Sequence, residues 1–456
     1  MSQINLFFNA IRENPDDDIP RMALAKHLEE RGDLRGELIR VQRILLRMAA
    51  DDSERPVLER SVRELLRRGE VTWLAELPAP ERRSFGFPSW RWEMRDGRLA
   101  VTMSADLFLD KDVQALAGSE SWDWVESLEL REVTPEQMEK IASSPLLAGV
   151  LSLTIGAVVA NHTPVGDAVA LAIAQSPAVA NLRELALPHN NISPKGAQAL
   201  ADSRYLLQLC SLDLSLNGLG TRGTKALAQS SALPKLARLE LAANAVGLEA
   251  VQALTRSPAM AGLTYLGLYR NEIDDRSVFL LADSPSITSL TDLNLRANRV
   301  LQKGCCALAE SPNFSNLRRL NLGECKNHVG TRGARALARS RYITHLQMLE
   351  IGENGIGNQG VAALASSANF ADLRELYLWE SNIGDHGVAA LTTSPHLTRL
   401  MLVDLRGNDI KGRCLKAFAA SPNLNRITQL FVDGVGIGRK AKAVLEQRYG
   451  KGLVLW

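Results

Sequence analysis

Apolar residues recur at a fixed spacing over more than half of this chain. From Leu182 onward, one frame repeats with a period of 27 residues, and its pattern is L-x-x-L-x-L-x-x-N. Its two closely spaced leucines alternate with a variable residue, which is the period of a half-buried strand. Such a period predicts a solenoid, in which each unit buries its apolar face against its neighbours. The copies begin at Leu182, Leu209, Leu236, Leu263, Leu290, Leu317, Leu346, Leu373, Leu400 and Ile427.

Each repeat continues from this strand into a turn and a helix. The asparagine stands where the chain leaves the strand, and its amide can pair with backbone groups that a turn leaves unpaired. A helical segment with small residues follows, such as Ala-Leu-Ala at 199–201, and a serine, often before proline, ends it. The step from Leu317 to Leu346 breaks the period by two residues, and we expect Cys325 to take the asparagine position there.

These repeats resemble leucine-rich repeats, and their long helical half resembles the ribonuclease-inhibitor-like subtype. The resemblance covers roughly residues 121–456, including two imperfect copies that begin near Val125 and Val150 and lack the asparagine. It implies an α/β solenoid of the horseshoe type, with parallel strands on the concave side and helices on the convex side. The resemblance also suggests a part in recognising a protein partner.

The segment before the repeats predicts a small all-α domain. Acidic residues at 16–18 and Gly-Asp at 32–33 separate three helical patterns, as expected at helix starts. The words AIRENPDDD (10–18), LEERGD (28–33) and RGELIRVQ (35–42) resemble a repeat-companion domain that precedes leucine-rich repeats in certain bacterial lineages. The apolar positions of the three helices are Ile4, Phe7, Phe8 and Ile11, then Ile19, Met22, Ala23 and 25–28, then Leu34, Leu38, Val41 and Leu45.

We therefore divide the chain into a companion domain (1–48), an N-terminal cap (49–120) and the repeats with a C-terminal cap (121–456). In the N-terminal cap, a helix around Leu65 precedes a predicted hairpin at 90–103, where Asp-Gly joins two alternating runs. A last helix at 440–449 and an apolar strand at 453–456 form the C-terminal cap, because terminal repeats need shielding.

Composition narrows the classes of function. The formal net charge of +2 gives no reason to expect nucleic acid or a membrane surface as the partner. The start of the chain lacks a basic segment followed by an apolar run, so we expect neither a signal peptide nor a membrane helix. Five cysteines without C-x-x-C pairs favour a reducing, cytoplasmic setting over a disulfide scaffold.

Several motifs that could carry chemistry have a plainer reading. G-x-G-x-x-G occurs at 218–223 and 355–360, but other repeats hold different residues in the same places, so these glycines are expected to shape turns. Cys305 and Cys306 are adjacent on a helix and do not share a face. The seven histidines show no ligand spacing. We therefore predict no catalytic residue, no cofactor and no metal.

The variable positions of the strands carry the candidate binding site. Tyr, Trp and Arg dominate binding hot spots, and they gather here with charges of both signs. A plainer alternative is that aromatic residues on these strands serve cross-strand packing. The predicted protein-binding residues are Arg238, Tyr265, Tyr269, Arg270, Asp292, Arg296, Arg319, Glu350, Glu353, Glu375, Tyr377, Trp379, Asp404, Arg406 and Phe431.

The sequence thus favours a non-enzymatic protein-interaction scaffold, which the resemblance associates with a bacterial regulatory or defence pathway. Basic and acidic residues alternate on the strand positions, so a phosphate backbone would meet repulsion as often as attraction. Rival readings are an enzyme regulator, such as a GTPase activator or a nucleotide-binding protein, and a protein that a protease cleaves. The partner and the oligomeric state are not predicted.

Overall fold

The computed structural model describes residues 3–13, 17–48, 52–73, 90–95, 98–156, 164–324, 327–433, 438–450 and 454–455. Its contacts divide the chain into two compact units, each considered by itself below. Unit 1 comprises Met1–Asn191, Asp202–Ser211 and Ala232–Pro234, and unit 2 comprises Ile192–Ala201, Leu212–Ser231 and Lys235–Trp456.

Unit 1 begins with helices and continues into a sheet. The helices are α1 (Gln3–Glu13), α2 (Asp18–Glu30), α3 (Leu34–Arg47), α4 (Arg55–Trp73), α5 (Ala105–Phe108), α6 (Lys111–Gln114), α7 (Glu120–Asp123), α8 (Met138–Ser143) and α9 (Asp167–Gln175). The strands are β1 (Trp90–Arg95), β2 (Arg98–Ser104), β3 (Val125–Arg131), β4 (Ser152–Ile155) and β5 (Glu184–Ala186). The predicted hairpin is confirmed by the antiparallel pairing of β1 with β2, while β2 to β5 pair in parallel.

The three predicted N-terminal helices are confirmed, but the buried face of α2 differs from the prediction. Ile19 is 75% exposed and Met22 is also exposed, whereas Arg21 is buried with 5% of its surface accessible. Arg21 precedes Leu24 by three residues and Ala25 by four, so the three side chains share the inward face of the helix. Hydrophobicity alone therefore misplaced this face by one residue.

An aromatic and cationic stack holds α1 against the start of the repeats in unit 1. The Phe8 ring meets the Trp124 ring edge-on, with 4.8 Å between centroids. The Arg98 guanidinium lies 4.2 Å from the Phe8 centroid and donates hydrogen bonds to the backbone oxygens of Asp123 and Trp124. Arg35 of α3 lies 4.0 Å from the Trp124 ring. The first helices and the hairpin thus share one core.

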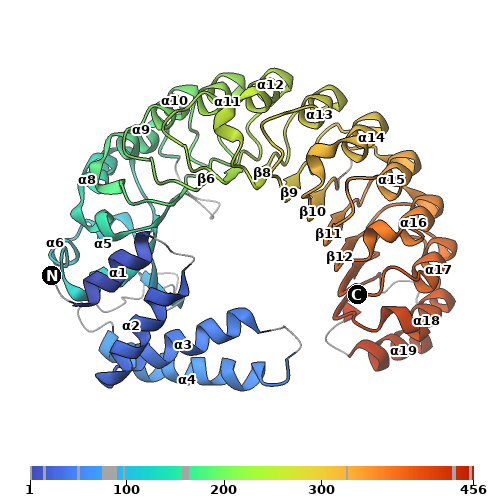
Figure 1. The fold of residues 1–456 in the computed structure, drawn as a ribbon, viewed down its shortest axis with the longest axis horizontal. Helices are drawn as coiled ribbons and strands as arrows, with labels where there is room; N and C mark the ends of the chain where they lie inside the picture. The colour runs from blue at the N-terminus through green and yellow to red at the C-terminus, as the bar shows by residue number, and fades with distance from the viewer. Residues whose placement is uncertain are drawn as a thin grey trace. The chain divides into compact units, whose positions relative to one another are not determined.

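Unit 2 alternates strands and helices in chain order. Its strands lie on the inner side of its curve and its helices on the outer side (Figure 1). The strands are β7 (Arg238–Glu240), β8 (Tyr265–Gly267), β9 (Asp292–Asn294), β10 (Arg319–Asn321), β11 (Met348–Glu350), β12 (Glu375–Tyr377), β13 (Leu402–Asp404), β14 (Gln429–Phe431) and β15 (Val454–Leu455); β6 (Ser211–Asp213) falls at the unit boundary. The helices are α10 (Pro194–Ala201), α11 (Gly220–Ala228), α12 (Leu248–Arg256), α13 (Asp275–Ala282), α14 (Gln302–Glu310), α15 (Gly330–Ala338), α16 (Gly357–Ala365), α17 (Asp385–Thr393), α18 (Gly412–Ala420) and α19 (Arg439–Tyr449).

The leucines of the frame form one continuous core in unit 2. From β7 to β14 neighbouring strands pair in parallel, and the fourth residue of each frame lies beside the fourth residue of the next. These side chains are almost fully buried. The predicted last strand pairs with β14. The repeats are therefore strand–turn–helix units of an α/β solenoid of leucine-rich repeats.

Asparagines link the turns of most repeats to the repeat before them. The Oδ1 atom of Asn298 accepts hydrogen bonds from the N–H groups of Asn271 and Ile273, at 3.1 and 3.0 Å. Its Nδ2 atom donates to the carbonyls of Leu268 and Leu295. Each such amide thus satisfies backbone groups that the turns free from the sheet, as predicted.

The expectation that Cys325 takes this position in its repeat is wrong. Asn327 fills the position: its Oδ1 accepts from the N–H of Val300 at 2.8 Å, and its Nδ2 donates to the carbonyls of Leu295 and Leu322. The two extra residues of this repeat move the asparagine along the chain and leave its place in space unchanged. Cys325 itself lies outside the described residues.

A second row of hydrogen bonds involves the serines that end the helices. The Oγ of Ser284 donates to the carbonyl of Thr255 at 2.7 Å and accepts from the N–H of Ser286 at 3.1 Å. Ser311, Ser340 and Ser421 make the equivalent bonds. The serine and proline pattern predicts helix stops, but these serines also connect consecutive repeats at the helical side.

We expect Asn298→Ala to lower the free energy of unfolding by roughly 3–5 kcal/mol, because several buried backbone groups lose their partners at once. Urea denaturation followed by far-ultraviolet circular dichroism measures this loss. Asn316→Ala is the control, since Asn316 is exposed and donates one bond, to Thr288. An equal loss in both variants would contradict the role given to the buried amides.

We expect Phe8→Ala to cost roughly 3–5 kcal/mol, because a fully buried ring is removed from contact with Trp124 and Arg98. Denaturation followed by tryptophan fluorescence suits this test, since Trp124 lies in the affected core. Leu6→Ala on the same helix should change little, because Leu6 is 58% exposed. A stable Phe8→Ala protein with unaltered fluorescence would argue against a shared core.

Candidate functional site

The parallel pairing of unit 2 aligns the predicted binding residues in rows. We call the exposed side of these strands, at positions three, five and seven of each frame, the strand face. At position three, Arg238, Tyr265, Asp292 and Arg319 lie on neighbouring strands in register. Neighbouring strands in a sheet are about 4.8 Å apart, so side chains in one row can touch.

The fifteen predicted residues fall into three groups. Positions three and five lie within the strands and hold Arg238, Tyr265, Asp292, Arg319, Glu350, Glu375, Tyr377, Asp404 and Phe431. Position seven follows each strand and holds Tyr269, Arg296, Trp379 and Arg406. Arg270 and Glu353 lie in the turns, both with a φ of 53°.

Two of the predicted contact residues are buried. Asp404 has 2% of its surface exposed and Glu350 has 7%. Asp404 accepts two hydrogen bonds from the Arg406 guanidinium, at 3.0 and 2.5 Å. Glu350 lies 3.5 Å from the Arg296 guanidinium and accepts from Asn321 at 2.6 Å. These carboxylates therefore hold arginines in place and have little surface to offer a partner.

At β7 and β8, an aromatic ring is held between charges. The Arg238 guanidinium lies 3.4 Å from the centroid of the Tyr265 ring. The Tyr265 hydroxyl donates to Glu240 at 2.5 Å. Burial raises the pKa of Glu240, and burial together with the Glu240 charge raises the pKa of Tyr265. The ring is fixed by these contacts and does not turn freely in solvent.

Further along the strand face, Arg319 lies between two carboxylates. Its guanidinium lies 3.5 Å from Asp292 on the neighbouring strand β9 and 3.3 Å from Glu375 on β12, two strands away in the other direction. The Tyr377 hydroxyl donates to Glu375 at 3.1 Å, and burial raises the pKa of Tyr377 to about 12. This phenol therefore stays protonated near neutral pH and acts as a hydrogen-bond donor.

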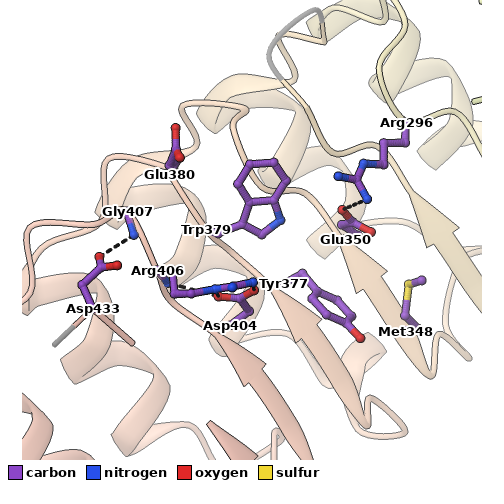
Figure 2. A pocket seen from close by; sticks show the side chains of 10 residues that line it. All are labelled: Arg296, Met348, Glu350, Tyr377, Trp379, Glu380, Asp404, Arg406, Gly407 and Asp433. Atoms are coloured by element: carbon purple, nitrogen blue, oxygen red, sulfur yellow. Dashed lines mark hydrogen bonds and ion pairs between the residues drawn. The ribbon is translucent and has the colours of Figure 1, made fainter. Parts of the chain in front are cut away.

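Around Trp379 the strand face is hollowed into an open depression of about 660 Å³. We call it the Trp379 depression. Figure 2 shows the indole between the Arg296–Glu350 pair and the Arg406–Asp404 pair. Arg296 also pairs with Glu324 at 2.9 Å, and its guanidinium lies 5.8 Å from the Trp379 centroid. The depression is thus lined by one ring and by paired charges.

Two glycines beside this depression leave room for the side chains that line it. Position seven is glycine in the two repeats between Arg296 and Trp379, at Gly323 and Gly352. A Cβ atom on Gly352 would come within 2.5 Å of the indole Nε1, and one on Gly323 within 2.7 Å of a Glu350 oxygen. The types of side chain along the strands do not signal these glycines, although the residues at position seven, taken in chain order, show the gap.

The motifs set aside earlier have structural roles. Gly220 and Gly357 begin α11 and α16 with φ values of 53° and 63°, a conformation that favours glycine. Cys305 is buried in a helix, and burial raises the pKa of its thiol. Across the described ranges, no three His, Cys, Asp or Glu side chains are grouped so that they could hold a metal.

A membrane-spanning helix is likewise missing from the part of the chain that the structure covers, since none of its helices is both long and apolar enough.

Comparison with known proteins agrees with the repeat architecture. A family model described as leucine-rich repeat matches residues 180–201, 209–228 and 342–365. No curated protein matches the sequence. Together with the strand–turn–helix units, the family match identifies these segments as leucine-rich repeats.

Several solved structures are similar in fold. An internalin from Listeria monocytogenes has 21% sequence identity and a TM-score of 0.42, with 73% of this chain and 86% of that chain covered. A chain of the Rad7 and Elc1 complex in yeast has 14% identity and a TM-score of 0.46, with 73% and 85% covered. A chain of a TLR13–ssRNA13 complex has 15% identity and a TM-score of 0.39, with 74% and 55% covered.

The pH dependence of stability tests the environment of Glu350. Burial raises the pKa of this carboxyl, against the lowering effect of Arg296. A raised folded-state pKa means that the folded protein holds the proton more tightly, so this group's contribution to stability falls as pH rises through the window above the unfolded pKa. Glu350→Gln should therefore gain stability relative to the wild type as the pH rises from about 4, the ordinary pKa of a glutamate, toward neutrality.

Chemical denaturation of both proteins across this range measures the difference. Glu353→Gln removes a carboxylate from the turn of the same repeat and serves as the control. A difference between wild type and Glu350→Gln that stays constant, or that shifts in favour of the wild type as pH rises, would refute the burial argument.

Proposed function

We propose that this chain is a non-enzymatic interaction scaffold that binds another protein on the strand face of unit 2. The observation that supports it is the row of partly exposed tyrosine, tryptophan and arginine side chains on the strand face, which contact carboxylates, guanidiniums or rings of neighbouring repeats. Residues of these types are enriched at the centres of protein interfaces.

Preorganisation favours this role. Arg296, Arg319 and Arg406 are already fixed by ion pairs in the free protein, so binding would immobilise few additional rotamers. The backbone beneath them is held by the asparagine and serine hydrogen bonds. A partner would therefore meet a surface whose shape and charges are already in place.

The mixed charges argue for protein and against nucleic acid. Each arginine named above has a carboxylate within 3.5 Å, so little positive charge is left to attract a phosphate backbone. We extend the proposal to a cytoplasmic protein of a bacterial regulatory or defence pathway with ribonuclease-inhibitor-like repeats. The 27-residue period and the resemblance of residues 1–48 to a companion domain support these finer points.

Affinity capture from a native lysate tests the function. Tyr269→Ala and Trp379→Ala should each reduce partner recovery at least about tenfold, because truncating an interface anchor commonly costs more than about 1.4 kcal/mol. Both rings are only partly buried, so the melting temperature should change little. Recovered proteins are quantified by mass spectrometry.

Phe279→Ala is the matched control. Phe279 is an aromatic residue of the same unit, 46% exposed, on helix α13 and away from the strands. It should retain the wild-type partners. Recovery of every wild-type partner by both Tyr269→Ala and Trp379→Ala would exclude the strand face as the binding surface.

A further inference from the structure

The charges that line the Trp379 depression do not balance. Four carboxylates, Glu350, Glu380, Asp404 and Asp433, face two guanidiniums, Arg296 and Arg406. The excess is therefore two negative charges, four minus two. Burial raises the pKa of Glu350, but even if that carboxyl were protonated, one negative charge would remain in excess.

Both arginines are already neutralised from within the chain. Arg406 is paired with Asp404 by two hydrogen bonds, and Arg296 is shared between Glu324 and Glu350. Neither guanidinium is therefore available as a strong binding group for an anion. An approaching phosphate would instead meet the two remaining carboxylates.

Those two carboxylates, Glu380 and Asp433, lack a cationic partner at salt-bridge distance within the described residues. Glu380 is exposed in the turn after β12. Asp433 accepts a hydrogen bond from the backbone N–H of Gly407 at 2.5 Å, which fixes the carboxylate toward the depression (Figure 2). The unbalanced charge therefore lies at the edge nearest β13 and β14.

The aromatic ring lies beside this charge. Gly352 leaves room for the Trp379 indole, because a Cβ atom at this position would come within 2.5 Å of the indole Nε1. The ring is thereby oriented in a depression wide enough for a side chain. A cation near the face of a tryptophan is attracted by its quadrupole, and a planar guanidinium can stack on the ring while it donates to carboxylates.

We propose that the Trp379 depression receives an arginine side chain of the protein partner, so that the partner presents a basic, arginine-containing segment to β12–β14. The guanidinium stacks on Trp379 and donates hydrogen bonds to Glu380 and Asp433. This proposal rests on the strand face being the binding surface, and it adds the chemistry of the group that is recognised there.

Fluorescence anisotropy of the full chain with labelled peptides tests the proposal directly. The probes are oligoarginine, oligolysine and oligoglutamate of equal length, together with a single-stranded RNA. Oligoarginine should bind more tightly than oligolysine and weaken as salt is added, while oligoglutamate and RNA should not bind. The variants Trp379→Leu and Glu380→Gln with Asp433→Asn should each weaken oligoarginine binding by about tenfold.

A matched pair of carboxylates on the helical side controls for overall charge. Asp283→Asn with Glu310→Gln removes two exposed carboxylates near α13 and α14, and should leave oligoarginine binding as in the wild type. Equal weakening by this pair, equal binding of oligolysine, binding of RNA, or no binding of oligoarginine to the wild type would each overturn the proposal.

The two proposals can fail separately. If Trp379→Ala loses captured partners while Glu380→Gln with Asp433→Asn keeps them all, the strand face binds protein but the arginine subsite is wrong. If neither the Tyr269 nor the Trp379 variant loses a partner in capture, the proposed function fails, whatever the peptides do.

Discussion

Unit 2 depends on one constraint. The backbone of every repeat turns twice, and the backbone N–H and C=O groups that leave the sheet or helix at these buried turns need hydrogen-bond partners within the protein. Its strands are at most three residues long, so the sheet ladder alone cannot pair these groups. Asparagines do so at the end of most strands, and buried serines do so at the end of most helices. Both side chains reach into the preceding repeat. The same contacts that satisfy the turns therefore also stack the units.

This constraint separates the positions of a repeat into two kinds. The leucines, the asparagine and the serine are fixed by burial, and changing them affects folding. Positions three, five and seven of the frame lie outside the leucine core, and most of them are partly exposed, so they can carry charge and aromatic rings. Because the frame places them at a regular spacing, a carboxylate on one strand can fix an arginine on another, as Glu375 does for Arg319. The rigid frame thus fixes the positions of the side chains on the strand face.

The sequence predicted the frame well because its signals are local and repeated. Strand positions, helix positions and the last strand follow from spacing alone. The features that the sequence did not predict depend on residues that are close in space but distant along the chain. Asn327 replaces Cys325 because an insertion changes numbering without changing position in space. Arg21 is buried and Ile19 exposed because the neighbours of α2 select its inner face. Asp404 and Glu350 are charged and were therefore expected at the surface, but they are buried beneath more exposed arginines, Arg406 and Arg296.

The candidate site also depends on three-dimensional neighbours that the sequence pattern does not show. Its aromatic and charged residues were visible in the sequence, whereas their arrangement around the depression was not, because it also depends on neighbours that have no side chain. Gly323 and Gly352 contribute no atoms to the strand face, yet they decide how Trp379 and Glu350 lie. A repeat protein of this kind can therefore change what it recognises in two ways, by exchanging a side chain on the face or by removing one beside it. The second way leaves the leucine frame and its hydrogen bonds untouched, so it opens a site at little cost to the fold.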